Sequence, residues 1–177
     1  YFRYIEKHPS RPHGSMSFGS SIHNTLYRFL EPLLSYHDTQ TSLLMEQPDL
    51  SITHLLALFD KSWIRIGYDS PKMMYARKVE GIKLLTSWYE KYAPTFGNPF
   101  VLETSFRCTI GDAEISGRYD RIDMDEAGAL HIIDYKTGKL RSQESVDQDM
   151  QLSMYMLAAE EQFKKPISNL SLYFFEH

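Results

Sequence analysis

The sequence is poor in several features that would assign a protein to a class at once. It has one cysteine, Cys108, which excludes an internal disulfide and a metal cluster held only by cysteines. No apolar run approaches the roughly 18 residues of a membrane span, and the chain does not open with a signal-peptide pattern. We therefore expect a globular protein of the cytoplasm, inside the cell and outside the membrane.

The chain also lacks an excess of positive charge, since its formal net charge is −4. Nucleic-acid-binding proteins are more often basic, so the charge argues mildly against that class. Carboxylates that bind metal ions would lower the net charge, however, and a basic groove can form on an acidic domain. The 177 residues, 42% of them hydrophobic and 24% charged, suit one domain with or without a helical insert.

The first half of the chain predicts helices joined by irregular segments. Residues 7–17, rich in Pro, Gly, Ser and His, predict a loop, and residues 37–50 predict an irregular connection. Serine caps and a Ser-Pro start mark the beginnings of the helices. The expected helices run from Ser20 or Ser21 to about Tyr36, from Ser51 to about Trp63, and from Pro71 to Pro94.

The second half changes to the alternating pattern of strands. Short turns join the first three strands, which are therefore expected to be antiparallel. A helix at 143–163, with Met150, Met154 and Leu157 at helical spacing, leads to a last strand that can join the sheet in parallel. The expected strands are 100–110, 113–123, 129–136 and 168–175. The predicted fold class is α/β, with a mixed central sheet flanked by helices.

Asp134 and Lys136 are two residues apart on the third expected strand, so their side chains project to the same face. If the turn is centred near Ala127, the residue numbers of each antiparallel pair add up to about 254. This register puts Asp120 opposite Asp134. Facing carboxylates repel each other unless a cation lies between them, and Mg²⁺ or Mn²⁺ suits carboxylate oxygens. Taken alone, the Asp-x-Lys spacing is common by chance and also describes a plain ion pair, with Asp120 capping a turn.

Three residues of the expected helices are further candidates. His23 lies in the first turn of the first helix, where a lone histidine is usually solvated or a cap; the alternative is a third metal ligand, with Gly19 allowing a close approach. Gln151 and Tyr155 are four residues apart and share a helix face. They form either a polar stripe or part of the lining of the site.

The remaining polar candidates are open between two roles. Glu103 interrupts an apolar strand and is either an additional acidic group at the metal site or a surface residue. Arg118, Arg121, Lys139 and Arg141 cluster in sequence around the acidic residues and are either phosphate contacts or ordinary surface charge.

Five motifs occur in order along residues 19–175 and resemble the RecB-type branch of the PD-(D/E)xK nuclease superfamily. They read G-S-S-I-H at 19–23, E at 103, G-R-Y-D-R-I-D at 117–123, I-I-D-Y-K-T-G at 132–138 and Q-L-S-M-Y at 151–155. The resemblance implies a restriction-endonuclease-like core at 18–36 and 96–177, with 37–95 as a helical insert.

The resemblance also implies a mechanism and the residues that carry it. His23, Asp120, Asp134 and the backbone carbonyl of Tyr135 would hold Mg²⁺ or Mn²⁺, and Lys136 would act as the catalytic lysine. The ion would polarise the phosphate and lower the pKa of a water, while the lysine stabilises charge on the phosphate. Gln151 and Tyr155 match the motif associated with DNA contact and support of the site.

The expected function is hydrolysis of DNA, preferably single-stranded, by an exonuclease-type domain that acts in DNA repair or recombination. The expected partner is a helicase domain or subunit, and the expected location includes the nucleoid. The alternative is an inactive nucleic-acid-binding or scaffolding domain of the same fold. Tyr1 and the apolar run at the other end suggest one nuclease domain, 1–177, cut from a larger protein. Some relatives carry an iron–sulfur cluster. This chain has one cysteine, so it cannot hold such a cluster by itself.

Overall fold

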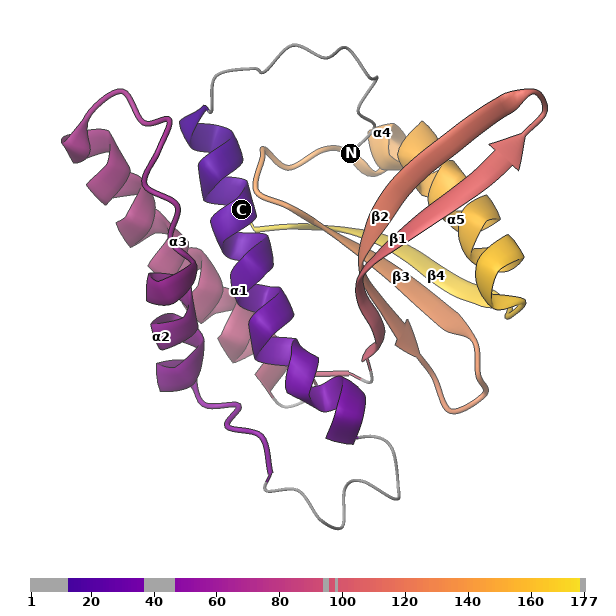
Figure 1. Cartoon of the computed structure of the whole chain (residues 1–177), viewed down its shortest axis with the longest axis horizontal. Coiled ribbons are helices and arrows are strands. Elements are labelled where there is room, and N and C mark those ends of the chain that lie inside the picture. Colours follow the sequence, from indigo (N-terminus) through magenta and orange to yellow (C-terminus); the bar gives the residue numbers. More distant parts are fainter. Residues whose placement is uncertain (1–12, 37–46, 94–95, 98, 176–177) are drawn as a thin grey trace.

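The computed structural model describes residues 13–93, 96–97 and 99–175, apart from 37–46, and has three layers (Figure 1). Helices α1–α3 lie on one side of a four-stranded sheet, and α4 and α5 lie on the other side. The elements are α1 Gly14–Tyr36, α2 Ile52–Ser62, α3 Pro71–Tyr92, β1 Pro99–Ile110, β2 Ala113–Met124, β3 Leu130–Lys136, α4 Gln143–Asp147, α5 Met150–Phe163 and β4 Ile167–Phe174.

The sheet confirms the predicted α/β class and strand order. The strands lie in the order β1-β2-β3-β4, with antiparallel pairing between the first three and parallel pairing of β3 with β4. The antiparallel strands follow from tight turns, and the parallel pair follows from the helical crossover through α4 and α5. The register of β2 with β3 pairs Arg121 with Ile133 and Ile122 with Ile132, as the predicted turn requires.

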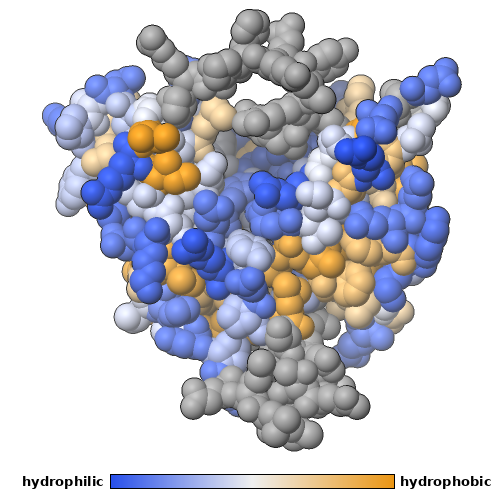
Figure 2. All heavy atoms as spheres, viewed as in Figure 1, coloured by the Kyte–Doolittle hydropathy of each residue, from blue (hydrophilic) through white to orange (hydrophobic). Residues whose placement is uncertain are grey.

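Two hydrophobic clusters hold the layers together, one on each face of the sheet. The first joins α1–α3 to the sheet through residues such as Phe29, Trp88 and Tyr135. The second joins α5 to the sheet through residues such as Ile132 and Tyr155. Figure 2 shows a recessed, mainly hydrophilic surface between the helical side and the sheet side. Each face of the sheet is therefore covered by its own hydrophobic core.

The first helix begins earlier than expected. It starts at Gly14, so the prediction of a loop at 7–17 is wrong for residues 14–17, and residues 7–12 lie outside the described part. Ser21 does not cap the helix but donates its hydroxyl to the carbonyl of Ser17, at 2.7 Å. Inside a helix, the serine hydroxyl bonds the carbonyl one turn earlier. The packing of Phe18 in the core extends the helix past Ser21 and overrides the preference of serine for a cap.

The last helix differs from the prediction in two ways. The segment 143–163 is broken into α4 and α5, because the side chain of Asp149 caps a new helix by accepting from Gln151 N. The face that is buried is also different. Leu152 and Tyr155 lie in the core, whereas Met150 is 69% and Leu157 is 43% exposed. The apolar spacing of Met150, Met154 and Leu157, which predicted a helix, therefore does not mark the face that is buried.

Within the described residues, none of the helices combines the length and the apolar character that a membrane crossing requires.

Candidate metal centre

Glu103 and Asp120 lie opposite each other in the β1–β2 hairpin. They are absent from the regular backbone pairs, although the pairs on either side keep one register. Glu103 has φ 46, a left-handed conformation that side chains with a Cβ rarely adopt. The strand faces also exchange here, because Leu102 packs in the first core and Phe106 in the second. Strained backbone of this kind typically costs about 1–3 kcal/mol and clusters at functional sites.

The β2–β3 ladder opens at the same place. Its last described pair is Arg121 with Ile133, one residue before Asp120 and Asp134 would meet in the same register. Asp120 Oδ2 accepts a hydrogen bond from the backbone N–H of Tyr135 at 2.8 Å instead. The predicted register is confirmed, and the two acidic residues lie where the strands separate.

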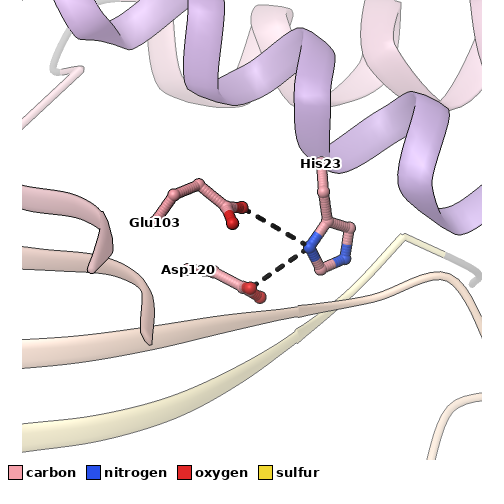
Figure 3. Close-up of side chains that lie close together, drawn as sticks. All are labelled: His23, Glu103 and Asp120. Atoms are coloured by element: carbon pink, nitrogen blue, oxygen red, sulfur yellow. Dashed lines mark hydrogen bonds and ion pairs between the residues drawn. The ribbon is translucent and has the colours of Figure 1, made fainter. Parts of the chain in front are cut away.

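Helix α1 adds an imidazole to the carboxylates. His23 Nδ1 lies 3.2 Å from Asp120 Oδ1 and 4.0 Å from Glu103 Oε1, as Figure 3 shows. His23 Nε2 lies 3.0 Å from the carbonyl oxygen of Tyr135. Ligand atoms of His23, Glu103 and Asp120 all lie within 4.8 Å of one another, a spacing that a metal ion can bridge.

Gly19 allows the close approach of α1 that this geometry needs. A Cβ built at Gly19 would lie 3.2 Å from Oγ1 of Thr137, just past the end of β3. A larger residue there would contact the Thr137 side chain closely, and His23 lies one turn further along the same helix.

Asp134 and Lys136 form the other half of the site. Lys136 Nζ lies 2.6 Å from Asp134 Oδ2 and donates to Gln151 Oε1 at 3.0 Å. Gln151 Nε2 donates to Asp134 Oδ1 at 3.2 Å and to Tyr155 Oη at 2.7 Å, and Tyr155 Oη lies 3.1 Å from Asp134 Oδ1. The structure thus brings Gln151 and Tyr155 of α5 onto the Asp134–Lys136 pair.

The charges of the site perturb one another. Burial and the negative charge of Asp120 raise the pKa of Asp134 above its ordinary value, against the pull of Lys136. Burial and Asp120 also raise the pKa of Glu103, against Arg118. Burial alone would lower the pKa of His23, but its hydrogen bond to Asp120 and the surrounding carboxylates raise it. Burial is the largest cause of the raised pKa for the two carboxyl groups, and the neighbouring carboxylates push the pKa of all three groups upward.

This donor set fits a divalent cation. The side chains of Glu103, Asp120 and Asp134 are only 18%, 12% and 5% exposed, so water screens their repulsion weakly. The buried Oδ2 of Asp134 has its ion-pair contact with Lys136, but no hydrogen bond of good geometry reaches it in the described part of the chain. Carboxylate oxygens with one imidazole suit Mg²⁺ or Mn²⁺.

The two arginines nearest the site have different surroundings. Arg118 is 62% exposed and pairs with Glu103 Oε2 at 3.0 Å, so its guanidinium lies at the open side of the centre. Arg121 is 5% exposed and holds both carboxylate oxygens of Asp123, at 2.6 and 2.7 Å, together with the carbonyl of Phe96. Arg121 is therefore a buried tie within the fold and not an exposed phosphate contact, and of its two predicted roles, DNA contact or support of the site, its surroundings suit only the second.

Sequence reasoning left Glu103 undecided, and the structure puts it in the tightest acidic group. Asp134 is absent from that group because Lys136, Gln151 and Tyr155 hold its carboxylate. Two sequence signals marked Glu103: it interrupts an apolar strand, and it matches one of the five ordered motifs.

Comparison with known proteins gives a family and distant matches among solved structures. The family model described as the PD-(D/E)XK nuclease superfamily matches residues 1–177. Protein VC1899 from Vibrio cholerae has a crystal structure that matches at 16% sequence identity with a TM-score of 0.33, covering 94% of this chain and 49% of that one. The chain thus spans about half the length of that protein. Among curated proteins, no relative matches.

Proposed function

This chain belongs to the PD-(D/E)XK nuclease superfamily, and from that premise we propose that it hydrolyses phosphodiester bonds of DNA, preferentially single-stranded, with Mg²⁺ or Mn²⁺. The observation that carries the proposal is the convergence of His23, Glu103 and Asp120 beside the Asp134–Lys136 pair. Membership of the superfamily implies a metal-dependent phosphodiesterase; the substrate and its strand state are our inference.

We assign the metal to Asp120 and Asp134, with His23, Glu103 and the carbonyl of Tyr135 as the surrounding donors. A divalent ion held there supplies polarisation of a phosphate oxygen and a lowered pKa for a nearby water. Asp120 keeps its position because it also accepts the Tyr135 N–H, which ties it to β3.

Lys136 is the residue we assign to charge stabilisation. Its side chain is 28% exposed, so it lies at the boundary between Asp134 and the open site, where a phosphate oxygen can reach it. Gln151 Oε1 holds the ammonium from the α5 side. A fixed positive charge that faces a developing negative charge typically contributes a factor of about 10²–10³ to the rate.

Gln151 and Tyr155 act as positioning residues in this proposal. Both hold Asp134 Oδ1, and Tyr155 Oη also lies 3.1 Å from the backbone carbonyl of Arg118 on β2. The exposed side chain of Arg118 is the phosphate contact that we favour on this side of the centre, because metal loading of Glu103 would leave its guanidinium available.

We further propose the wider setting that the five ordered motifs suggest. The chain would be a RecB-type exonuclease module in DNA repair or recombination, acting beside a helicase domain or subunit in the cytoplasm or at the nucleoid. Residues 37–95 would be an insert on a core formed by 18–36 and 96–177. Packing of α2 and α3 on α1, in the same cluster that reaches the sheet, supports a helical addition of this kind.

Cleavage of a labelled single-stranded oligodeoxynucleotide tests the proposal. The purified chain is expected to cut it with Mg²⁺ or Mn²⁺, to stop on addition of EDTA, and to lose the activity as Asp134→Asn. Metal-independent cleavage, or cleavage unaffected by that substitution, would contradict the mechanism. Strand binding without any cleavage would support the alternative of an inactive binding domain.

A further inference from the structure

A cavity of about 340 Å³ lies between α3 and the sheet, on the face that α1–α3 cover. Side chains of α3, β2, β3 and β4 line it, together with the connection between α3 and β1. Small-molecule sites in proteins have volumes of about this size and combine aromatic walls with a few polar groups. The lining of this cavity has both features.

Four aromatic side chains form its walls. The rings of Tyr92 and Tyr173 lie 5.4 Å apart at an interplanar angle of 73°, and those of Tyr135 and Tyr173 lie 6.1 Å apart at 81°. Trp88 lies 5.9 Å from Tyr92, and all four residues line the cavity. Because neighbouring rings stand nearly at right angles, a planar ligand can stack on one ring and meet the edge of another.

Two polar pairs line the same cavity. His131 Nε2 lies 2.8 Å from Ser171 Oγ, which links β3 to β4. Burial lowers the pKa of His131, so the neutral imidazole has one donor and one acceptor nitrogen. On β2, Asp123 accepts two hydrogen bonds from Arg121, and its carboxylate has further lone pairs beyond those two. Hydrogen-bonding groups between aromatic walls suit a heterocycle better than a hydrocarbon.

A positive charge lies beside two of the aromatic walls. Lys91 Nζ lies 5.5 Å from the ring centroid of Tyr92 and 5.4 Å from that of Tyr173. The lysine side chain is exposed and does not line the cavity, although both tyrosines do. An anionic group attached to a bound heterocycle can therefore pair with this ammonium outside the cavity.

We propose that this cavity binds one nucleobase whose phosphate pairs with Lys91, supplied by a free nucleotide or by an unpaired nucleotide of a strand. A base has a flat face for the aromatic walls, and ring nitrogens and exocyclic groups for His131, Ser171 and Asp123.

The proposed base site is separate from the metal centre. None of Glu103, Asp120 and Asp134 lines the cavity. Tyr135 connects the two sites, because its ring lines the cavity and its carbonyl oxygen lies 3.0 Å from His23 Nε2. Base binding therefore requires neither the metal nor cleavage, and this inference does not depend on the proposed nuclease function.

Isothermal titration calorimetry with the whole chain in EDTA tests the base site. The ligands are the four deoxynucleoside 5′-monophosphates, and deoxyribose 5-phosphate is the probe without a base. At least one nucleotide is expected to bind at least about tenfold more tightly than the sugar phosphate, because only the nucleotide can stack on the aromatic walls. The nucleoside with the same base should bind more weakly than its nucleotide, because it cannot pair with Lys91.

Two variants with matched controls locate the binding. Ser171→Leu fills part of the cavity and should weaken nucleotide binding at least about tenfold, whereas Ser168→Leu, at an exposed position of the same strand, should not change it. Lys91→Met should weaken binding of the nucleotide and leave binding of the nucleoside unchanged. Lys83→Met, at an exposed position earlier on α3, should leave both unchanged.

Trp88 offers a readout that requires no change in the cavity. The chain has two tryptophans, and Nε1 of the other one, Trp63, has no hydrogen-bond partner among the described residues. Trp63→Phe therefore leaves Trp88 as the only indole and breaks no hydrogen bond. A base bound in the cavity should quench its fluorescence with the Kd that calorimetry gives, so the test stands even if Ser171→Leu fails to fold.

A trinucleotide of the base that binds best distinguishes the two sources. Binding that Ser171→Leu weakens shows that the cavity accepts a strand, and exclusion of the trinucleotide shows that it takes a free nucleotide. Three results would overturn the proposal: no nucleotide binds more tightly than the sugar phosphate, Ser171→Leu and Ser168→Leu bind alike, or Trp88 fluorescence does not respond. Failure of the nuclease is read separately, from cleavage in the presence of metal.

Discussion

Asp120 and Asp123 lie three residues apart on β2. Replacement by asparagine should mainly weaken metal binding at Asp120 and mainly lower stability at Asp123. Asp120 faces the metal centre, where it pairs with His23 at 3.2 Å and adds to the repulsion on Asp134. Asp123 holds the buried guanidinium of Arg121 through both oxygens. The same chemical change therefore removes a proposed metal ligand in one case and a structural tie in the other.

The magnitudes follow from these contacts. Without metal, Asp120→Asn loses the pair with His23 but relieves the repulsion on Asp134, and these opposing terms should leave stability within about 1 kcal/mol of wild type. Asp123→Asn leaves Arg121 buried with its carboxylate partner removed, which costs about 3 kcal/mol or more. At about 2–4 °C per kcal/mol for a chain of this size, Tm falls by about 6–12 °C.

Metal should largely close the gap in stability between the two variants. At a free concentration of 100 times Kd, the ion stabilises wild type by about 2.7 kcal/mol, or about 5–10 °C. If Asp120→Asn weakens binding about 100-fold, the same concentration adds only about 0.4 kcal/mol, or about 1 °C. Asp123→Asn should keep the full increase from its lower starting point.

Differential scanning fluorimetry with and without Mg²⁺ or Mn²⁺ at neutral pH measures both quantities. The reasoning is refuted if Asp120→Asn retains the metal-dependent increase in Tm, or if Asp123→Asn loses it while still folded.

Three further predictions concern the same centre. Lys136→Met should reduce cleavage at least about 100-fold while retaining the metal-dependent increase in Tm, because the ammonium stabilises charge and does not hold the ion; parallel loss of both would contradict that role. The pKa values of His23 and Asp134 are raised in the folded protein, so folding favours their protonated forms. Without metal, the free energy of unfolding should therefore decline as the pH rises through these pKa values. Bound metal should remove that decline. Denaturation at several pH values, with and without metal, measures this, and identical pH profiles would count against it. Tyr155→Phe removes a buried hydroxyl with several polar partners and should lower the free energy of unfolding by about 1–3 kcal/mol. Tyr75→Phe, at a side chain that is 71% exposed, should change Tm little. Equal effects of the two substitutions in thermal melts would refute the distinction.

The parts of the fold set by local chemistry could be predicted from the sequence. Alternation within a strand predicted a common face for Asp134 and Lys136, and the structure puts their charged atoms 2.6 Å apart. The turn before β3 fixed the register that brings Asp120 to the same end of the sheet. These features depend on periods of two residues and on turn length, which neighbouring residues determine.

Features that depend on packing between distant segments could not be predicted in this way. Glu103 reaches His23 only because the β1–β2 hairpin changes faces at a residue with φ 46, and nothing local in the sequence requires that kink. Arg121 has one partner close in sequence, Asp123, but its burial also depends on the carbonyl of Phe96, 25 positions away. The spacing of Met150, Met154 and Leu157 predicted a helix but not which of its faces is buried, because packing on the sheet decides that.

The central claim is that acidic residues from β1, β2 and β3 hold a divalent ion beside Lys136. Anomalous diffraction from a crystal of this chain soaked in Mn²⁺ tests it most directly. We predict one strong peak in contact with the carboxylates of Asp120 and Asp134, with the His23 imidazole next to it. Full occupancy at other acidic groups, with no peak at Asp120, would contradict the account.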